Sequence, residues 1–410
     1  MKILSLKNYL LLICFWSLTC SGQNQIKKYI QASSTPIYTI QPDSTDFTDL
    51  EIIGKAIGDS KVVMLGEQDH GDAPTFLAKT RIIKYLHEKK GFNVLAFESD
   101  FFGLNYGWDN LTKEKSLIDT FLRKNIFPVW TLCNTCKELF YNYIPETYET
   151  QNPLIISGFD NQMYLNYSSK NLTLKLDSVL RQLNLPITTK TKYVKEVIPI
   201  IDSLILNYGQ NLNVYSTCDS YLNEIKDEIG KKIDKNAFWM MVIENLIQLN
   251  IEYMNIVNNN DTARDYQMAM NLKWLIENKF PKEKIIVWAA SYHLSKSEIW
   301  YNSSTMGSTF TSNSSSKSSY VIGFASYEGE AGMLGSKHYT LNKPNRNGFE
   351  NWIDKSVNFS FTDFKKFNEL FPNNSETFYT TILGHQDLKR EWNKFFDGIF
   401  FIRKMYPCSK

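Results

Sequence analysis

Six short runs of apolar residues recur along the chain, and this pattern limits the fold more than any other feature of the sequence. The runs lie at 61–65, 92–98, 153–160, 284–291, 319–326 and 398–402. Continuous apolar runs are typical of strands buried on both faces, which occur mainly in parallel sheets covered by helices. Helical stretches separate several of the runs. The pattern therefore predicts an α/β fold with a mainly parallel central sheet flanked by helices.

The segment between the first two runs has the signals of a crossover helix. Asp72 can cap its start, Pro74 falls in its first turn, and Gly91 follows its end. Such a helix joins two parallel strands into a βαβ unit. His87 is expected on the exposed outer side of this helix.

A helical insertion is predicted between the third and fourth runs, at about 168–280. This region contains long stretches such as NAFWMMVIENLIQLNIEYMNIV and no convincing strand. The polar, Ser-rich stretch 301–320 predicts a mobile loop. A hydrophobic content of 43% is ample for one large core, so residues 23–410 are expected to form a single α/β domain.

The first 22 residues predict export. Lys2 and Lys7 precede the apolar run YLLLICFWSL, which is too short to span a bilayer core of about 30 Å but suits a signal peptide. Two fates stay open: lipidation of Cys20, which would tether the protein to a membrane, or cleavage after Gly22. Either fate predicts an exported protein, periplasmic or lipid-anchored to the cell envelope.

Charge gives no sign of a nucleic-acid partner. Lys plus Arg number 45 and Asp plus Glu number 43, and the two signs are interspersed without a basic stripe. The partner that we expect is a small molecule.

Four cysteines lie beyond Cys14 and Cys20, and a disulfide is permitted among them in an exported protein. Two of the four, Cys133 and Cys136, form a CNTC motif. No thioredoxin-like pattern surrounds it, and a lone pair cannot form a four-ligand zinc site. We therefore interpret it as a structural or incidental pair.

Polar side chains follow four of the predicted strands. The first strand is followed by Glu67 and His70, the second ends at Glu98, the third ends at Asp160, and the fourth is followed by His293. The carboxyl ends of parallel strands meet at one edge of a sheet, where ligands bind. A carboxylate beside an imidazole fixes its tautomer and raises its basicity. The pattern predicts a catalytic site in which His70 takes a proton from water.

Metal binding is the main chemical alternative, since two His and two Glu could ligate zinc. The common HxxxH and HxH spacings are absent, so our prediction includes no metal and no cofactor. His338 and His385 fall in predicted loops without acidic neighbours, and we assign them no role.

Several longer motifs then resemble a known family, the erythromycin esterases and their relatives. These motifs are LGEQDHG, KTRIIKYLHEKKGFNVLAFESD, ISGFDNQ, ARDYQMAMNLKWLIE and IIVWAASYHLSK, and they occur in the family's order and spacing. The resemblance extends to SYVIGFASYEG and covers most of the chain. It implies hydrolysis of an ester, with a macrolide lactone as the best-known substrate, by a histidine that activates water without an obligatory metal.

By motif position, the resemblance makes Glu67 and His70 the core pair, with His70 as the general base. Lys79 stands where the family often has arginine, and it would bind a substrate oxygen or steady the carboxylates. Glu98 would complete the acidic cluster, and His293 matches the second histidine of the family's A-H-N-x-H motif. Two further candidates for the cleft, beside Asp160, are Arg264 and Asp265, at the start of the helix before the fourth strand.

The chain departs from the family pattern at three positions. Ala290 and Ser291 replace the first histidine and the asparagine of A-H-N-x-H, and Pro74 occupies a position that is frequently glutamate. These changes leave the His70 centre intact but argue against a macrolide as the substrate.

The prediction is thus a carboxylic ester hydrolase in which water is the nucleophile, because no G-x-S-x-G elbow is present. Two alternatives stay open. One is a surface lipoprotein that binds haem or a metal without turnover, and the other is a metal-dependent hydrolase.

Overall fold

The computed structural model describes residues 24–206, 212–256, 262–300, 303–312 and 318–410. The predicted signal peptide and Cys20 lie outside these residues. Among the helices of the described part, none has the length and apolar character needed to cross a membrane.

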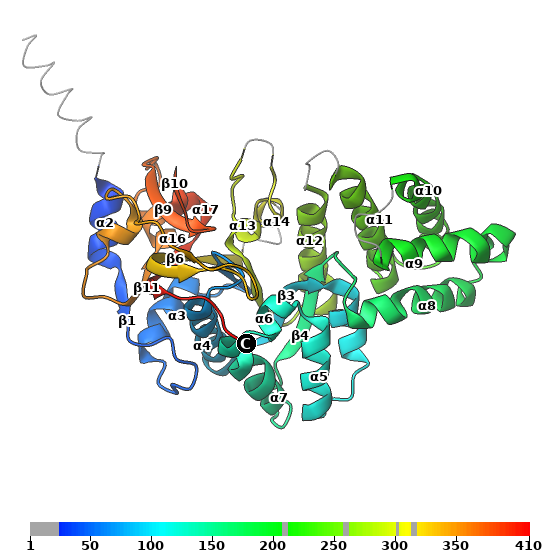
Figure 1. Ribbon diagram of the computed structural model, residues 1–410, viewed down its shortest axis with the longest axis horizontal. Coiled ribbons are helices and arrows are strands. Elements are labelled where there is room, and N and C mark those ends of the chain that lie inside the picture. Colours follow the sequence, from blue (N-terminus) through cyan, green and yellow to red (C-terminus); the bar gives the residue numbers. More distant parts are fainter. Residues whose placement is uncertain (1–23, 207–211, 257–261, 301–302, 313–317) are drawn as a thin grey trace, which may run out of the picture.

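A nine-stranded sheet forms the centre of the molecule (Figure 1). The strands follow the order β1-β8-β11-β6-β2-β5-β3-β4, and β7 pairs with β6. Their bounds are β1 (Thr35–Ile37), β2 (Val62–Glu67), β3 (Phe92–Asp100), β4 (Ile155–Asp160), β5 (Lys284–Ala290), β6 (Ser319–Ala331), β7 (Tyr339–Thr340), β8 (Phe359–Asp363) and β11 (Gly398–Met405).

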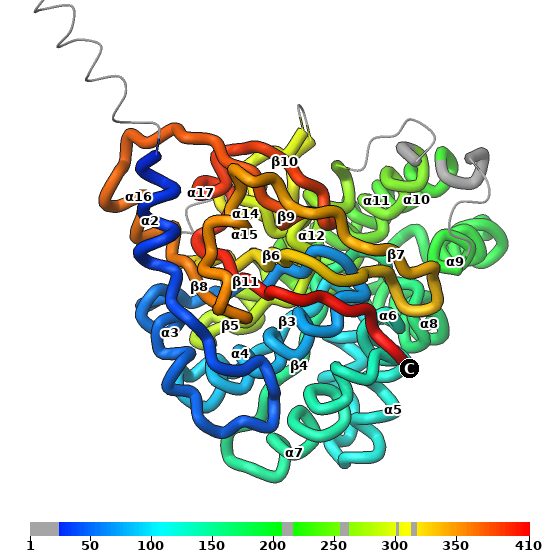
Figure 2. The backbone as a smooth tube through the Cα atoms, turned by 60° about the vertical axis from the view of Figure 1, so that its left-hand side comes forward, coloured from blue at the N-terminus to red at the C-terminus, as the bar shows by residue number. Residues whose placement is uncertain are grey.

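The strands from β11 to β4 pair in parallel, which confirms the predicted α/β class and mainly parallel sheet. Each of the six predicted apolar runs forms one of these strands. β8 and β1 extend the sheet in antiparallel pairs, and the sequence analysis did not predict them. β11 therefore lies inside the sheet, between β8 and β6, although it comes last among the strands in the chain (Figure 2).

Helices cover both faces of the sheet, and this explains why the strand sequences are continuously apolar. In β2, Val62 and Met64 face one core, to which the helices after β4 contribute, whereas Val63 and Leu65 face the other, built with α4. The helices before β4 are α2 (Gln25–Ser33), α3 (Glu51–Ile57), α4 (Ala73–Lys90), α5 (Lys115–Asn125), α6 (Pro128–Thr131) and α7 (Ile144–Thr147).

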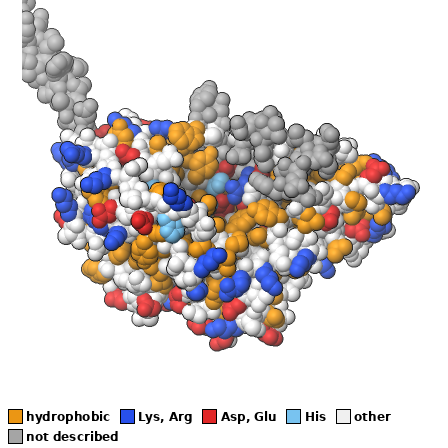
Figure 3. Space-filling view, in the orientation of Figure 1, with side chains coloured by type: hydrophobic (Ala, Val, Ile, Leu, Met, Phe, Trp, Pro, Cys, Tyr) orange, Lys and Arg blue, Asp and Glu red, His pale blue; other side chains and the backbone are white. Residues whose placement is uncertain are grey.

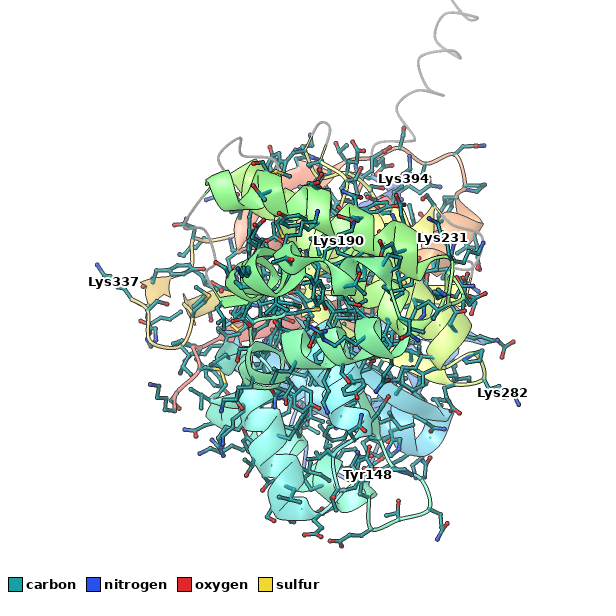
Figure 4. All side chains as sticks on the ribbon, turned by 90° about the vertical axis from the view of Figure 1, so that its right-hand side faces the viewer. Tyr148, Lys190, Lys231, Lys282, Lys337 and Lys394 are labelled. Carbon is teal, nitrogen blue, oxygen red and sulfur yellow. A yellow bond between two sulfur atoms is a disulfide. The ribbon has the colours of Figure 1, made fainter. Side chains whose placement is uncertain are left out.

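Helices also fill the described chain between β4 and β5, as the predicted insertion requires. They are α8 (Asn166–Gln182), α9 (Ile198–Leu206), α10 (Leu212–Ile229), α11 (Phe238–Ile256) and α12 (Thr262–Trp274). They gather on the right-hand side of the molecule in Figure 1, and Figure 4 shows them, in green, facing the viewer. The helices after β5 are short: α13 (Ser291–Leu294), α14 (Met306–Thr311), α15 (Phe349–Trp352), α16 (Phe364–Leu370) and α17 (Trp392–Phe395).

Two local predictions about the crossover helix α4 need correction. Asp72 stands at its N-cap position, but its carboxylate makes no capping hydrogen bond to the helix. His87 is buried rather than exposed, because the π-helical segment η4 (Glu138–Tyr143) covers this side of α4 and the Tyr143 hydroxyl lies 2.8 Å from His87 Nδ1. Gly91 ends the helix in the left-handed region with φ 71°, as a glycine there predicts.

The prediction of a loop over 301–320 is wrong for 306–311, which form α14. Thr305 and Ser308 cap this helix reciprocally, and its own residues Met306 and Phe310 are buried. Residues 319–320 already belong to β6. The remainder of this prediction falls partly on 301–302 and 313–317, which lie outside the described residues.

A two-stranded hairpin, β9 (Phe378–Leu383) and β10 (Gln386–Arg390), packs beside β6. Gly384 and His385 form its turn with φ values of 54° and 56°. This hairpin was not predicted from the sequence.

A disulfide joins Cys133 to Cys408, across 275 residues of chain. Cys136 is buried as a free thiol, so the two cysteines of CNTC do not bond to each other. The segment around Cys408 also binds backbone: Cys408 N donates to Gly71 O over 2.8 Å, and Asn134 N donates to Ser409 O over 2.8 Å. The disulfide thus ties the segment that follows β11 to the segment that follows α6, and the hydrogen bond to Gly71 joins it to the loop before α4.

Candidate active site

The site begins where β2 ends. β2 and β5 run side by side in register, so Glu67 lies opposite Ala290 and the chain that follows each strand leaves from the same edge. Gly66 allows a close approach here, because a Cβ at this position would lie 2.6 Å from Ser291 Oγ. This packing brings the loop after β2 against α13, which carries His293.

A fully buried carboxylate, Glu67, holds His70. Glu67 Oε1 lies 3.1 Å from His70 Nδ1 and accepts a hydrogen bond of 3.0 Å from Trp130 Nε1. The Trp130 ring also packs edge-on to the His70 ring, with 5.5 Å between centroids. The His70 side chain retains 31% of its exposure. The imidazole is therefore fixed on one side and open to a small molecule on the other.

Lys79 lies beneath this pair. Its Nζ donates to Glu67 Oε2 and stands 4.1 Å from the centre of the Trp288 ring. The side chain is fully buried, and this burial lowers its pKa although the Glu67 charge opposes the change. Lys79 thus contacts the carboxylate, and its burial separates it from solvent.

A second cluster forms at the ends of β3 and β4. Arg264, near the start of α12, binds the Asp160 carboxylate through Nε at 3.2 Å and Nη2 at 2.7 Å. The same Nη2 donates to Glu98 Oε1 over 2.9 Å, and Glu98 Oε2 accepts from Ala290 N over 2.9 Å. Burial alone would raise the pKa of Glu98, but the charges of His293, Arg264 and His70 outweigh it and lower that pKa to about 2.

His293 closes this cluster. Its Nδ1 lies 2.8 Å from Asp265 Oδ1, and its Nε2 lies 3.3 Å from Glu98 Oε1 and 3.2 Å from Arg264 Nη1. Burial alone would lower the pKa of His293, but the charges of Asp265 and Glu98 outweigh this effect and raise that pKa to about 9. The raised pKa favours the protonated ring, in which Nδ1 donates to Asp265 and Nε2 faces Glu98.

The charge of Glu98, in the second cluster, acts on His70 in the first. Burial would lower the pKa of His70, but the Glu67 hydrogen bond and the Glu98 charge reverse this effect and raise it above 6.5. Figure 3 shows one face of the molecule, with a hollow in which a histidine side chain lies beside acidic and basic ones.

All eight residues that the sequence singled out lie at this end of the sheet or directly support it. They are Glu67, His70, Lys79, Glu98, Asp160, Arg264, Asp265 and His293. Among the described residues, no three His, Cys, Asp or Glu side chains are arranged to hold a metal ion.

Two residues that contact Glu67 or the loop carrying His70 were not predicted from the sequence. Trp130 lies in α6, which is far in the sequence from the predicted apolar strands, and only its contact with Glu67 reveals its part in the site. His385 was assigned no acidic neighbour, but its Nε2 lies 3.0 Å from the buried Asp72 carboxylate. That assignment was wrong because the acid lies 313 residues away in the sequence.

This parallel sheet, with ionisable side chains gathered at its carboxyl edge, is the arrangement of an α/β enzyme. A model of the erythromycin esterase family matches residues 87–405, and the chain belongs to that family. Membership supports a hydrolase of the esterase-like kind.

Individual relatives agree with this assignment. YbfO of Bacillus subtilis (strain 168), provisionally named a hydrolase, is 29% identical over 314 residues, which are 68% of each chain. Erythromycin esterase type II of Escherichia coli is 23% identical over 93% of this chain and 98% of its own.

Solved structures share the fold. A Bacillus cereus protein superposes with a TM-score of 0.73 at 20% identity and covers 94% of this chain and 98% of its own. A mutant of erythromycin esterase EreC in its open conformation gives a TM-score of 0.69 at 16% identity, over 91% of this chain and 97% of its own.

Proposed function

We propose that this protein hydrolyses a carboxylic ester or lactone of a small molecule, with water activated by His70. The observation that carries the proposal is the Glu67–His70 contact beside a second cluster, which contains the Arg264 guanidinium and the His293 ring, at one edge of the sheet. Because Glu67 engages Nδ1, the neutral tautomer carries its proton there and Nε2 is the basic atom.

The reaction then follows with every proton assigned. His70 Nε2 takes a proton from water while the water oxygen forms a bond to the ester carbonyl carbon. The resulting tetrahedral intermediate collapses, the carbon–oxygen bond to the alcohol breaks, and the His70 imidazolium returns the proton to the leaving alkoxide. Glu67 stabilises the imidazolium between these steps.

Arg264 and the His293 imidazolium supply positive charge for the oxyanion that forms on the carbonyl oxygen. Their side chains keep 19% and 13% of their exposure, which leaves part of each accessible from outside. A well-placed donor to an oxyanion contributes about 3 kcal/mol to transition-state stabilisation. Asp160, Glu98 and Asp265 hold these two cations in place.

We also propose that the protein is exported, and that Cys20 provides a membrane tether if it is lipidated. The Cys133–Cys408 disulfide supports export, because disulfides persist mainly in oxidising compartments outside the cytoplasm. The departures at Ala290 and Ser291 favour an ester other than a macrolide.

A panel of carboxylic esters and lactones, assayed with the wild type and His70→Ala in parallel, tests the function. We expect at least one compound that the wild type hydrolyses and the variant does not. Circular dichroism of both proteins shows that the fold is kept. A panel on which the two proteins hydrolyse the same compounds at the same rates would remove His70 from the reaction.

The pH dependence of kcat/KM tests the roles of the two histidines. His70 must be neutral to act as a base, so the rate should rise with pH through a pKa above 6.5. His293 must be protonated to stabilise the oxyanion, so the rate should fall again as pH passes about 9. A bell-shaped profile is therefore expected, and a rate that keeps rising beyond pH 10 would exclude the cationic role of His293.

A further inference from the structure

A buried histidine that belongs to neither cluster contacts the loop that carries His70. His385, in the turn of the β9–β10 hairpin, places Nε2 3.0 Å from Asp72 Oδ1 and Nδ1 3.1 Å from Ser326 Oγ. The set of Ser, His and Asp has the composition of a hydrolytic triad. All three side chains are buried, however, so no substrate reaches the Ser326 hydroxyl. The arrangement is a tether instead of a second reaction centre.

The tether acts on the backbone next to His70. While Asp72 Oδ1 faces His385, Asp72 Oδ2 accepts a hydrogen bond of 3.1 Å from Asp69 N. The same hairpin holds the other end of the loop, because Gly384 N donates to Gln68 O over 3.1 Å. The 67–72 loop is thus fastened to the hairpin on both sides of its histidine.

The backbone of the turn fits this role. His385 adopts φ 56°, in the left-handed region that residues with a Cβ adopt only at a cost and that histidine tolerates better than most. Its two side-chain contacts point in opposite directions along the ring, one to β6 and one to the loop. The turn therefore aims the ring at Asp72 and holds it there.

We propose that His385 is a positioning residue for His70: through Asp72 it holds the 67–72 loop in the place where His70 meets Glu67 and the substrate. This inference rests on the proposed function, since it assigns His70 the part of general base. Asp72 is fully buried, so the loss of its donor would leave an unsatisfied carboxylate that draws the loop toward water. A displacement of about 1 Å at a catalytic group costs about 10²-fold in rate.

Two substitutions separate positioning from simple packing. In His385→Gln the amide Nε2 reaches the place of the ring Nε2 and still donates to Asp72. In His385→Asn the shorter amide reaches only Ser326, although asparagine suits the left-handed backbone better. We expect kcat to fall about 10- to 100-fold in His385→Asn, with KM within about threefold, and to recover in His385→Gln.

His87→Asn is the matched control. His87 is also buried and also makes one contact to a neighbouring side chain, but it lies at the opposite end of α4, about 20 Å from Asp72 along the helix. We expect this substitution to lower the melting temperature without changing kcat. If His385→Asn does not fold, Asp72→Ala removes the same contact from the side of the loop and is expected to give the same loss of kcat.

A second readout does not depend on activity. The nuclear magnetic resonance titration of His70 should show its pKa falling toward 6.5 in His385→Asn, because the Glu67 contact loosens, and staying raised in His385→Gln. Equal kcat in wild type and His385→Asn, or equal losses in the Asn and Gln variants, would overturn the inference. Activity that survives His70→Ala would instead refute the proposed function, while the His70 titration still reports on the tether.

Discussion

Replacement of His70 by alanine is expected to lower kcat/KM about 10²- to 10⁴-fold, the range in which a positioned general base acts. The side chain is half-buried, so its removal should leave the melting temperature nearly unchanged. The effect should fall on kcat, because the lost proton transfer occurs only after the substrate has bound. Steady-state kinetics on a compound found with the ester panel measures this change in kcat/KM.

Added imidazole sharpens this test. It should restore part of the rate of His70→Ala, since the vacated space opens to solvent and Trp130 still provides an edge for an aromatic ring. His338→Ala is the control, because His338 is exposed in the described structure and should keep the wild-type rate. Should His70→Ala hydrolyse the compound within about threefold of the wild type, His70 is not the base.

Replacement of Arg264 by methionine should destabilise the protein by about 3–5 kcal/mol, the usual cost of removing one partner from a buried ion pair. Two buried carboxylates, Glu98 and Asp160, share the guanidinium, and without it they face each other with less compensation. Denaturant unfolding of the variant and the wild type measures the difference. The variant should also lose activity, because a donor to the oxyanion is gone.

The loss of stability should depend on pH in a defined direction. In the wild type the pKa of Glu98 is lowered to about 2, so its ion pairs stabilise the fold fully above its ordinary pKa near 4.5 and lose this effect as pH falls toward 2. The difference in the free energy of unfolding between Arg264→Met and the wild type should therefore become smaller below pH 4.5.

An exposed ion pair provides the control for this experiment. Arg181 pairs with Asp177 four residues away on α8, and the two side chains keep 46% and 32% of their exposure. Arg181→Met should cost less than about 1 kcal/mol. If the two methionine variants unfold at the same denaturant concentration, Arg264 is not the counter-ion that the geometry indicates.

The sequence predicted the parallel part of the sheet because its strands are buried on both faces. Strands such as β2 and β5 have no polar face. This can be recognised from their own residues, without knowing which strands lie beside them. β8 and β1 were missed because β1 is only three residues long and β8 mixes serine and threonine with phenylalanine. The hairpin β9–β10 was missed because its turn uses Gly384 and His385 in place of a common turn pair.

In the candidate site, too, some residues could be predicted from the strands and others could not. Glu67, Glu98, Asp160 and His293 lie at or just past the carboxyl ends of strands, so the topology of a parallel sheet suffices to gather them. Contacts that join distant segments, such as Trp130 to Glu67 or His385 to Asp72, depend on how loops pack over the sheet. No local pattern in one sequence encodes such packing.

The place of β11 within the sheet has a consequence for biosynthesis. During translation β6 and β8 emerge before their shared partner, so both must wait with unpaired backbone groups until 398–405 leaves the ribosome. Unpaired strands of this kind readily bind to other nascent chains. A polypeptide that stops short of β11 is therefore expected to aggregate, whatever its intrinsic chemistry.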